Sequence, residues 1–480
     1  MRLYVIFRYV GFVLLLIALF MLISAGVSLI YEDSGFFPLF YSALIAALFA
    51  VFPMIFVPPV DEINNNEGTV IVVASWLLSC IVGMLPYILW DGEFSITNSL
   101  FESVSGFTTT GASILNNIEG IPKGLLFWRA CTHWIGGVGI IIFILAVLPS
   151  MGVAGMILYR SEMSPAAMRQ FKMRTKDATE VLLYVYLGLT AAETILLMLF
   201  GMDWFDAVTH SFATIATGGF STKNLSVASF NSPAIEIIIM FFMIVSGMNF
   251  ALIFLVITGK YKEVSTWSVV KYYLIANFAA ILLVALNIWN TNYESFIDAL
   301  RYSSFQILSV GTSTGFANAD SSMWPGFSQL IIIFFTLQCA SAGSTSGGIK
   351  IDRILILYKA IIRRLRILRH PSAIIPVTLD RLKIEDSNVA AALLYIIFYI
   401  MIVFVSTLIL SLTNVDMLSA FSGSAAMMGN VGPGLSKVGS MANYSNIPEF
   451  GKWVFSLVML LGRLEIYGLI IFLYPKTWIK

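Results

Sequence analysis

Four short segments of the chain repeat one pattern, in which a small or polar residue and then Thr or Val stand before a glycine. The segments are Thr109-Thr110-Gly111, Ala216-Thr217-Gly218, Ser313-Thr314-Gly315 and Asn430-Val431-Gly432. If four such loops meet around one axis inside a membrane protein, their backbone carbonyl oxygens can replace the water shell of a dehydrated cation. Each glycine would supply backbone freedom that a Cβ atom would obstruct. The predicted chemistry is cation coordination by main-chain oxygens.

A semi-apolar segment leads into each of these four patterns. The four segments are residues 93–109, 203–217, 294–313 and 415–431, and each opens near an acidic residue: Asp91 or Glu93, Asp203 or Asp206, Glu294 or Asp298, and Asp416. Each is about three helical turns long, which is too short and too polar to cross a bilayer. Non-helical backbone at membrane depth is tolerated where it lines a cavity, so we expect re-entrant pore helices.

The composition places these segments in a membrane protein. Of the 480 residues, 58% are hydrophobic and only 11% are charged, whereas an average soluble domain carries roughly 25% charged residues. Apolar runs of spanning length recur from end to end, which argues against the short alternating segments of a β-barrel. The predicted spans are residues 4–30, 37–58, 68–90, 124–149, 178–200, 233–258, 268–289, 325–348, 388–412 and 450–474.

These spans and loops predict an all-α polytopic membrane protein. Two N-terminal helices precede four helix–pore-loop–helix repeats that surround a central pore. The predicted parts are an extension at 1–66 and repeats at 67–158, 159–262, 263–370 and 371–480, the third with an intramembrane loop at 341–348. The three cysteines (Cys80, Cys131 and Cys339) and three histidines include no CxxC pair, so a zinc site or disulfide framework is not expected.

The distribution of basic residues predicts the orientation. Lysines and arginines gather in the segments that connect one repeat to the next, at 159–177, 259–271 and 350–385. The positive-inside rule places these linkers in the cytoplasm and the re-entrant loops outside. Both chain termini then fall on the cytoplasmic side.

The second helix of the third repeat contains a run that a helix accommodates poorly. Residues 341–347 are all Gly, Ala, Ser or Thr, and Gly348 follows. Because glycine costs a helix interior about 1 kcal/mol relative to alanine, we expect this helix to break at membrane depth. Gly136, Gly247 and Gly462 lie at similar levels in the other repeats, where close helix packing through small residues is the alternative to a break.

Arg463 follows Gly462 deep in the last apolar run, with Glu465 nearby. A charge at this depth is expensive and usually faces a cavity or a partner. By repeat alignment Arg463 lies level with the break in the third repeat, on the pore side. A structural Arg463–Glu465 or arginine–carbonyl interaction is the alternative. Glu193 is expected to be a packing or water-facing carboxylate near the outer end of its helix, and His133 and His210 are expected to be structural.

Six motifs in this order resemble the TrkH/KtrB/HKT superfamily of potassium transporters over essentially the whole chain. They are Ser-Gly-Phe-Thr-Thr-Thr-Gly-Ala (105–112), Ala-Thr-Gly-Gly-Phe-Ser (216–221), Ser-Thr-Gly-Phe-Ala (313–317), Gly-Asn-Val-Gly-Pro-Gly (429–434), Ala-Gly-Ser-Thr-Ser-Gly-Gly-Ile-Lys (342–350) and Gly-Arg-Leu-Glu (462–465). The two leading helices favour the TrkH type within this superfamily. By family likeness, glycine rather than serine at position 111 points to potassium over sodium.

The resemblance implies potassium uptake across the bacterial inner membrane through a pore like that of a potassium channel. It implies that the twelve residues of the four patterns bind K⁺ and that the chain forms a homodimer with a cytosolic, nucleotide-binding ring of TrkA-type subunits. The implied gate is a plug formed by Gly343, Ser344, Thr345, Ser346, Gly347 and Gly348 together with Arg463. Membrane lipid is expected against the basic linkers. We expect no nucleotide or other organic cofactor in this chain, because the Gly136–Gly139 run lacks the strand and lysine of a phosphate loop. A nucleic-acid partner is not expected either.

Two other classes of protein are weighed against this one. A secondary transporter with broken helices also shows Gly-interrupted segments, but it does not need four filter patterns on acid-headed half-helices. An integral-membrane enzyme would need a nucleophile, a metal or an acid–base cluster at helix depth. The sequence leaves open whether transport is purely channel-like or coupled to protons or sodium, what the K⁺/Na⁺ selectivity ratio is, which nucleotide acts on the regulatory partner, and whether that partner is essential.

Overall fold

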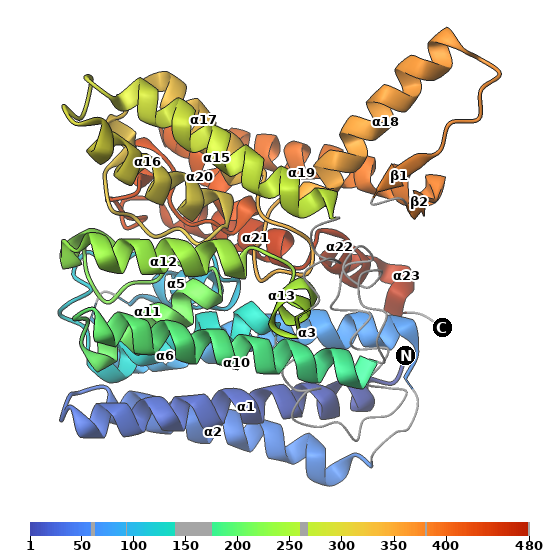
Figure 1. The fold of residues 1–480 in the computed structure, drawn as a ribbon. Helices are drawn as coiled ribbons and strands as arrows, with labels where there is room; N and C mark the ends of the chain where they lie inside the picture. Colours follow the sequence, from blue (N-terminus) through green and yellow to red (C-terminus); the bar gives the residue numbers. More distant parts are fainter. Residues whose placement is uncertain (59–62, 93, 140–174, 260–266, 380–381, 479–480) are drawn as a thin grey trace.

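The computed structural model describes residues 1–58, 63–92, 94–139, 175–259, 267–379 and 382–478, and these residues are mostly helical (Figure 1). The first half contains α1 (Leu3–Ile30), α2 (Phe36–Phe56), α3 (Asn65–Gly83), α4 (Leu85–Trp90), α5 (Ile96–Phe107), α6 (Lys123–Val138), α10 (Thr175–Leu199), α11 (Trp204–Ile215), α12 (Pro233–Ser246) and α13 (Phe250–Ile257). The second half contains α15 (Ser268–Ile288), α16 (Phe296–Gly311), α17 (Gly326–Leu337), α18 (Ile351–Arg369), β1 (Val377–Leu379), β2 (Leu382–Ile384), α19 (Asp386–Ser411), α20 (Met417–Gly429), α21 (Glu449–Arg463), α22 (Tyr467–Leu473) and α23 (Pro475–Trp478). Short 3₁₀ turns lie at Ser226–Phe230, Ser321–Met323 and Ser436–Val438.

The predicted architecture of two leading helices and four repeats is confirmed. Helices α1 and α2 pack against each other, and α1 also packs against α3 and α6 of the first repeat. Each repeat then supplies a long helix, a short helix and a second, interrupted helix. In the part of the chain that the structure describes, six helices are long and apolar enough to cross a membrane, or eight if each of two bent pairs is one span.

The outward faces of the long helices are apolar. Phe49 on α2, Phe278 on α15 and Phe404 on α19 are 63%, 63% and 60% exposed. Such exposure of large apolar side chains along spanning helices is what a hydrocarbon solvent requires. The cysteines Cys80, Cys131 and Cys339 are buried and free, as expected for small apolar residues.

The four predicted pore helices are present as α5, α11, α16 and α20. Two of them begin at an acid, since Asp203 accepts from the amides of Phe205 and Asp206, and Asp416 from that of Ser419. In the other two the cap is a serine, Ser95 for α5 and Ser295 for α16. All four helices thus open near an acidic residue, as the sequence predicted, but in the first and third repeats a serine hydroxyl oxygen accepts from the free amides.

The second helices are more interrupted than the sequence suggested. The predicted span 233–258 bends by 107° between α12 and α13, and the span 450–474 bends by 112° between α21 and α22. The span 325–348 ends at Leu337, before the run of small residues begins. In the first repeat α6 ends at Val138 with Gly139 at φ 84°. The predicted end of the 124–149 span and most of linkers 159–177 and 259–271 lie outside the described residues.

Both described termini lie at one end of the molecule, which is also the end from which α18 and the β1–β2 hairpin project (Figure 1). The strands pair antiparallel, with Val377 opposite Ile384. The chain therefore carries its longest described basic segment, residues 350–379, on the same side as its two ends.

Candidate functional site

The chain leaves each pore helix through the same unusual backbone conformation. Thr109, Thr217, Ser313 and Asn430 all have positive φ, between 51° and 58°. The residue two positions later is a glycine in each case, and these glycines, Gly111, Gly219, Gly315 and Gly432, have φ between 79° and 92°. Non-glycine residues with positive φ are uncommon, so four copies of one such turn mark an equivalent position in four repeats.

This conformation corrects the register of the second pattern by one residue. The equivalent triplet is Thr217-Gly218-Gly219, and not Ala216-Thr217-Gly218 as the sequence pattern predicted. The amide hydrogen bonds agree, because Thr110 donates to Ser105 O and Gly218 donates to Ala213 O, five residues back in each. Two adjacent glycines follow Thr217, so the sequence alone could not show which one carries the turn.

The four turns touch one another in a closed ring. A Cβ atom built on Gly111 would lie closer than 3.0 Å to the carbonyl oxygen of Gly218. In the same way, a Cβ on the glycine of each repeat would collide with a carbonyl oxygen of the next repeat: Gly219 with Thr314 O, Gly315 with Val431 O, and Gly432 with Thr110 O. The order runs one, two, three, four and back to one. The four segments therefore surround one axis and leave no room for a side chain at the glycines.

The side chains at this level form hydrogen bonds within and between repeats. Thr108 and Thr312 pair with Thr110 and Thr314 through hydroxyl groups at 2.8 Å and 2.7 Å. Asn430 Nδ2 donates to Thr110 Oγ1 at 3.0 Å and joins the fourth repeat to the first. Within the described residues, no group of three or more His, Cys, Asp or Glu side chains gathers to hold a metal ion. The ligands that this ring offers a cation are neutral oxygens.

The loop after α17 touches this ring directly. Gly347 N donates to Ser313 Oγ at 3.0 Å, and Thr217 Oγ1 lies 3.3 Å from Thr345 Oγ1. Thr345 also donates to Ile215 O at 3.0 Å. At the bend between α12 and α13, Asn249 Nδ2 donates to Ala342 O at 2.8 Å. The predicted break is thus a structured loop, and it is held by hydrogen bonds from several helices.

Arg463 lies at the end of α21, where it donates hydrogen bonds to backbone carbonyls. Its Nη1 donates to Thr345 O at 2.8 Å, and its Nη2 donates to Gly137 O at 3.2 Å and also to Gly136 O. Of the two structural interactions expected for Arg463, with Glu465 or with carbonyls, the interaction with backbone carbonyls is present. Glu465 forms its ion pair with Arg353 of α18, at 2.5 Å. The arginine joins the loop of the third repeat to the end of α6 in the first.

A family model for TrkH, described as a cation transport protein, matches residues 42–478. The chain belongs to the TrkH family. It is similar to the Trk system potassium uptake protein TrkH of Escherichia coli (strain K12), with 36% identity over 483 residues that cover 98% of each chain. Its identity to TrkH of Halomonas elongata is 32% over 491 residues, covering 100% of each. The crystal structure of the potassium transporter TrkH from Vibrio parahaemolyticus matches with a TM-score of 0.89 and 33% identity over 100% of both chains.

Lys350 is a residue beside the ring to which sequence reasoning gave no contact with the loop. Its ammonium group is inside the protein, where it donates to the carbonyl oxygen of Ser346 and lies 3.2 Å from Ser346 Oγ. The side chain is buried, with 7% exposure for the residue. Lys350 was counted with the basic linker that follows it. Its position directly after a glycine-rich run at membrane depth was the available signal.

The other titratable residues singled out from the sequence lie in the protein interior. His133 Nδ1 is 2.7 Å from Gly106 O, and Phe220 N donates to His133 Nε2 at 3.2 Å. His210 contacts Asp206 O and Ser221 Oγ at 2.7 Å and 2.9 Å. Glu193 is fully buried, which excludes a water-facing position and leaves the packing role.

Proposed function

We propose that this chain carries potassium ions into the bacterial cell through a pore whose narrowest part is the ring of four turns. The observation that carries the proposal is the ring of contacts, in which a glycine of each repeat adjoins a carbonyl of the next repeat and the fourth repeat adjoins the first. The names of the similar proteins support potassium as the ion, since those of E. coli and H. elongata are called potassium uptake proteins.

The proposed K⁺ ligands are backbone oxygens of the four turns. These are the segments Thr109-Thr110-Gly111, Thr217-Gly218-Gly219, Ser313-Thr314-Gly315 and Asn430-Val431-Gly432, the second in its corrected register. Neutral carbonyls replace the hydration shell of K⁺ without holding the ion too tightly to leave. The pore helices α5, α11, α16 and α20 end at this ring, and their C-terminal dipole ends add partial negative charge there.

The proposed gate lies directly beside the filter. Residues Gly343 to Gly348 form a plug, and Arg463 latches it through the carbonyl of Thr345. The guanidinium also places a positive charge in the path of a cation. Movement of a cytoplasmic element such as α18 would withdraw the loop, because α18 follows the loop directly in the chain. The Arg353–Glu465 ion pair also joins α18 to the segment between α21 and α22.

The proposed assembly follows the family resemblance and the charge distribution. The basic linkers 159–177, 259–271 and 350–385, and both termini, face the cytoplasm of a cell bounded by the inner membrane. Each of the proposed units 67–158, 159–262, 263–370 and 371–480 supplies one turn, and residues 1–66 form an extension. The chain forms a homodimer that binds a cytosolic TrkA-type ring, and its basic linkers also contact anionic lipid.

The test of the filter is Gly111→Ser in proteoliposomes, with reversal potentials measured in mixed K⁺ and Na⁺. An added side chain would strike the Gly218 carbonyl, so we expect the K⁺/Na⁺ permeability ratio to fall about tenfold, equivalent to ~1.4 kcal/mol. The matched control is Gly188→Ser on α10, where a Cβ has nothing within 4 Å. An unchanged permeability ratio in well-folded Gly111→Ser protein contradicts the assignment of the filter.

A second experiment measures K⁺ flux through the wild-type protein with and without a proton gradient, which separates channel-like from proton-coupled transport.

A further inference from the structure

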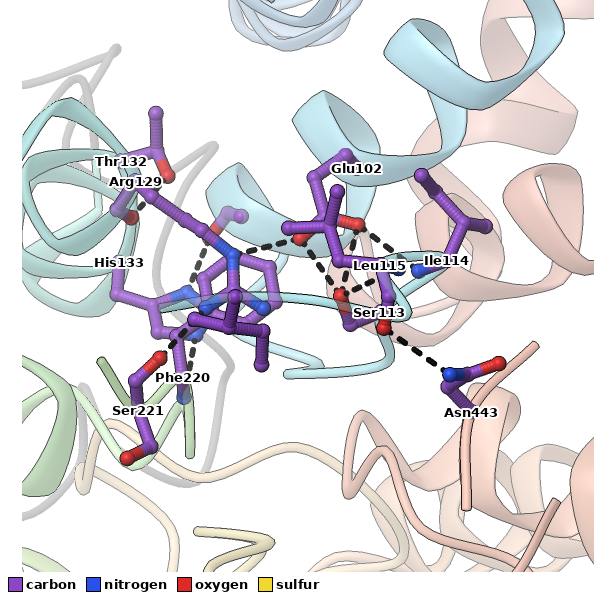
Figure 2. Close-up of polar contacts among 12 residues, drawn as sticks. Glu102, Ser113, Ile114, Leu115, Arg129, Thr132, His133, Phe220, Ser221 and Asn443 are labelled. Carbon is purple, nitrogen blue, oxygen red and sulfur yellow. Dashed lines mark hydrogen bonds and ion pairs between the residues drawn. The ribbon is translucent and has the colours of Figure 1, made fainter. Parts of the chain in front are cut away.

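A buried ion pair lies beside the ring, in the first repeat (Figure 2). Arg129 of α6 and Glu102 of α5 approach to 2.6 Å, and their side chains are 4% and 0% exposed. Two charges removed from water are tolerated only when their geometry and remaining hydrogen bonds are good. Their other contacts therefore show what this pair is positioned to hold.

Arg129 holds the second repeat immediately after its filter glycine. Its guanidinium carbon lies 3.5 Å from the centre of the Phe220 ring. Its Nη1 donates to Ser221 O at 2.9 Å. Phe220 and Ser221 are the two residues after Gly219, so one side chain of the first repeat fixes both the ring and the main chain of the neighbouring turn.

His133 holds Phe220 from the opposite side. The two rings stack at 4.0 Å with an angle of 19°. At these distances His133 and Arg129 cannot share one face of the ring, so Phe220 is sandwiched between them. The carbonyl of Gly106 can only accept, so His133 Nδ1 donates to it and Nε2 accepts from Phe220 N. His133 therefore anchors this turn to the pore helix of the first repeat.

Glu102 holds the first repeat's own turn and reaches toward the fourth. Its carboxylate accepts from Ser113 Oγ and from Ile114 N, both at 3.1 Å, just after Gly111. Ser113 O in turn accepts from Tyr444 N at 2.8 Å. The hydroxyl of Tyr444 donates to the carbonyl of the filter glycine Gly432 at 2.7 Å. The hydrogen-bonded chain thus links three of the four turns.

We infer that Arg129 and Glu102 are positioning residues that set the ion selectivity of the filter. This inference rests on the proposed function. The pair touches no ion; it acts by fixing the segments directly after Gly111 and Gly219, and thereby the spacing of the carbonyls before them. A guanidinium does this where an ammonium cannot, because its planar face stacks on Phe220 while its fork bonds Ser221 and Glu102 together.

The test compares Arg129→Lys and Glu102→Gln with wild type in proteoliposomes, measuring reversal potentials and the midpoint of thermal unfolding. We expect each variant to lower the K⁺/Na⁺ permeability ratio about tenfold, or ~1.4 kcal/mol. The matched control is Glu67→Gln, which removes another buried carboxylate from an ion pair, that with Arg2 at 2.8 Å, away from the ring. It should lower the unfolding midpoint and leave the ratio unchanged.

A lowered midpoint with an unchanged ratio in Arg129→Lys would overturn the inference, since it is the signature of a purely structural pair. If Arg129→Lys and Glu102→Gln do not fold, Phe220→Leu takes their place, because it keeps an apolar side chain and removes the stacking surface. An unchanged ratio in Phe220→Leu also overturns the inference. Gly111→Ser in the same preparation distinguishes the two failures: if it loses selectivity and Arg129→Lys does not, only the positioning role fails.

Discussion

The ring of turns and the loop beside it lie in contact, yet they are held by different means. In the ring, backbone packs against backbone: each glycine of the four turns adjoins a carbonyl of the next repeat, and the arrangement occurs four times. In the loop, side chains from different elements donate to carbonyls of one segment of the third repeat, and Asn249, Arg463 and Lys350 are examples. Backbone hydrogen bonds to Gly247 and Phe250 add to them. Backbone contacts without free space fix a geometry, whereas individual side-chain bonds can be broken in turn. The ring is therefore suited to keep one fixed geometry, whereas the loop is suited to move when its hydrogen bonds break.

The sharpest test of this comparison substitutes a glycine of each region by alanine. Gly315 and Gly343 both have positive φ, at 82° and 81°. A Cβ on Gly315 would meet the backbone of Val431, but on Gly343 it would meet the side chain of Asn249, which can move. Left-handed strain and overpacking each cost about 1–3 kcal/mol, so Gly315→Ala should reduce K⁺ flux about a hundredfold. Gly343→Ala should instead raise flux, because it loosens the loop. Equal losses in both folded variants, measured as liposome flux, would remove the distinction.

The next effect is expected from removing the loop or its latch. Deleting residues 343–347, or changing Arg463 to Ala, should raise K⁺ flux about tenfold without a regulatory partner. The arginine donates several bonds to buried carbonyls, and a bond to a charged group is worth about 1.5–3 kcal/mol. Flux is measured in liposomes that contain this chain alone. If both variants fold and conduct no better than wild type, the loop is a packing feature and not a gate.

A smaller increase is expected for Lys350→Met. This change keeps an unbranched side chain of similar length and removes the ammonium that bonds Ser346, so the loop should open more often. We expect about a threefold rise in partner-free flux, equivalent to ~0.7 kcal/mol. Lys437→Met serves as the control, because that side chain is 72% exposed. If Lys350→Met gives the same flux as the control, Lys350 does not stabilise the closed position of the loop.

The smallest effect concerns α18, outside both regions. Changing Arg363, Arg364 and Arg366 together to Gln should weaken binding of a TrkA-type ring about twofold, equivalent to ~0.4 kcal/mol, and leave partner-free flux unchanged. Ion pairs between exposed side chains contribute about 1 kcal/mol at most. One such pair on α18 already joins Arg363 to Asp386 at 2.5 Å. Binding is measured by pull-down and titration. Unaltered binding together with normal regulation would place the interface elsewhere.

The sequence predicted the helices of this fold well where local composition and segment length decide the structure. The pore helices were placed to within a few residues because their polarity and length differ from those of spans. The register at Gly218 and Gly219 was not predictable, because either glycine fits the pattern and only the φ angles separate them. The bends of α12–α13 and α21–α22 lie at or just after Gly247 and Gly462, where the sequence predicted a weak point but could not separate a break from close helix packing. The partners of Lys350, Arg353 and Glu102 depend on packing between distant segments, which no local pattern contains.

The interrupted helix of the third repeat has a consequence for how such a pore can be built. In an assembly of four identical subunits, any insertion beside the axis appears four times, and four loops of this size would compete for one space. Here the quarters are joined in one polypeptide, so each can diverge while the ring keeps its pseudo-fourfold order. Covalent linkage thus permits one quarter to carry the loop, another the arginine and a third the carbonyls of Gly136 and Gly137 that the arginine also binds. The proposed gate is asymmetric, although the ring beside it is nearly fourfold.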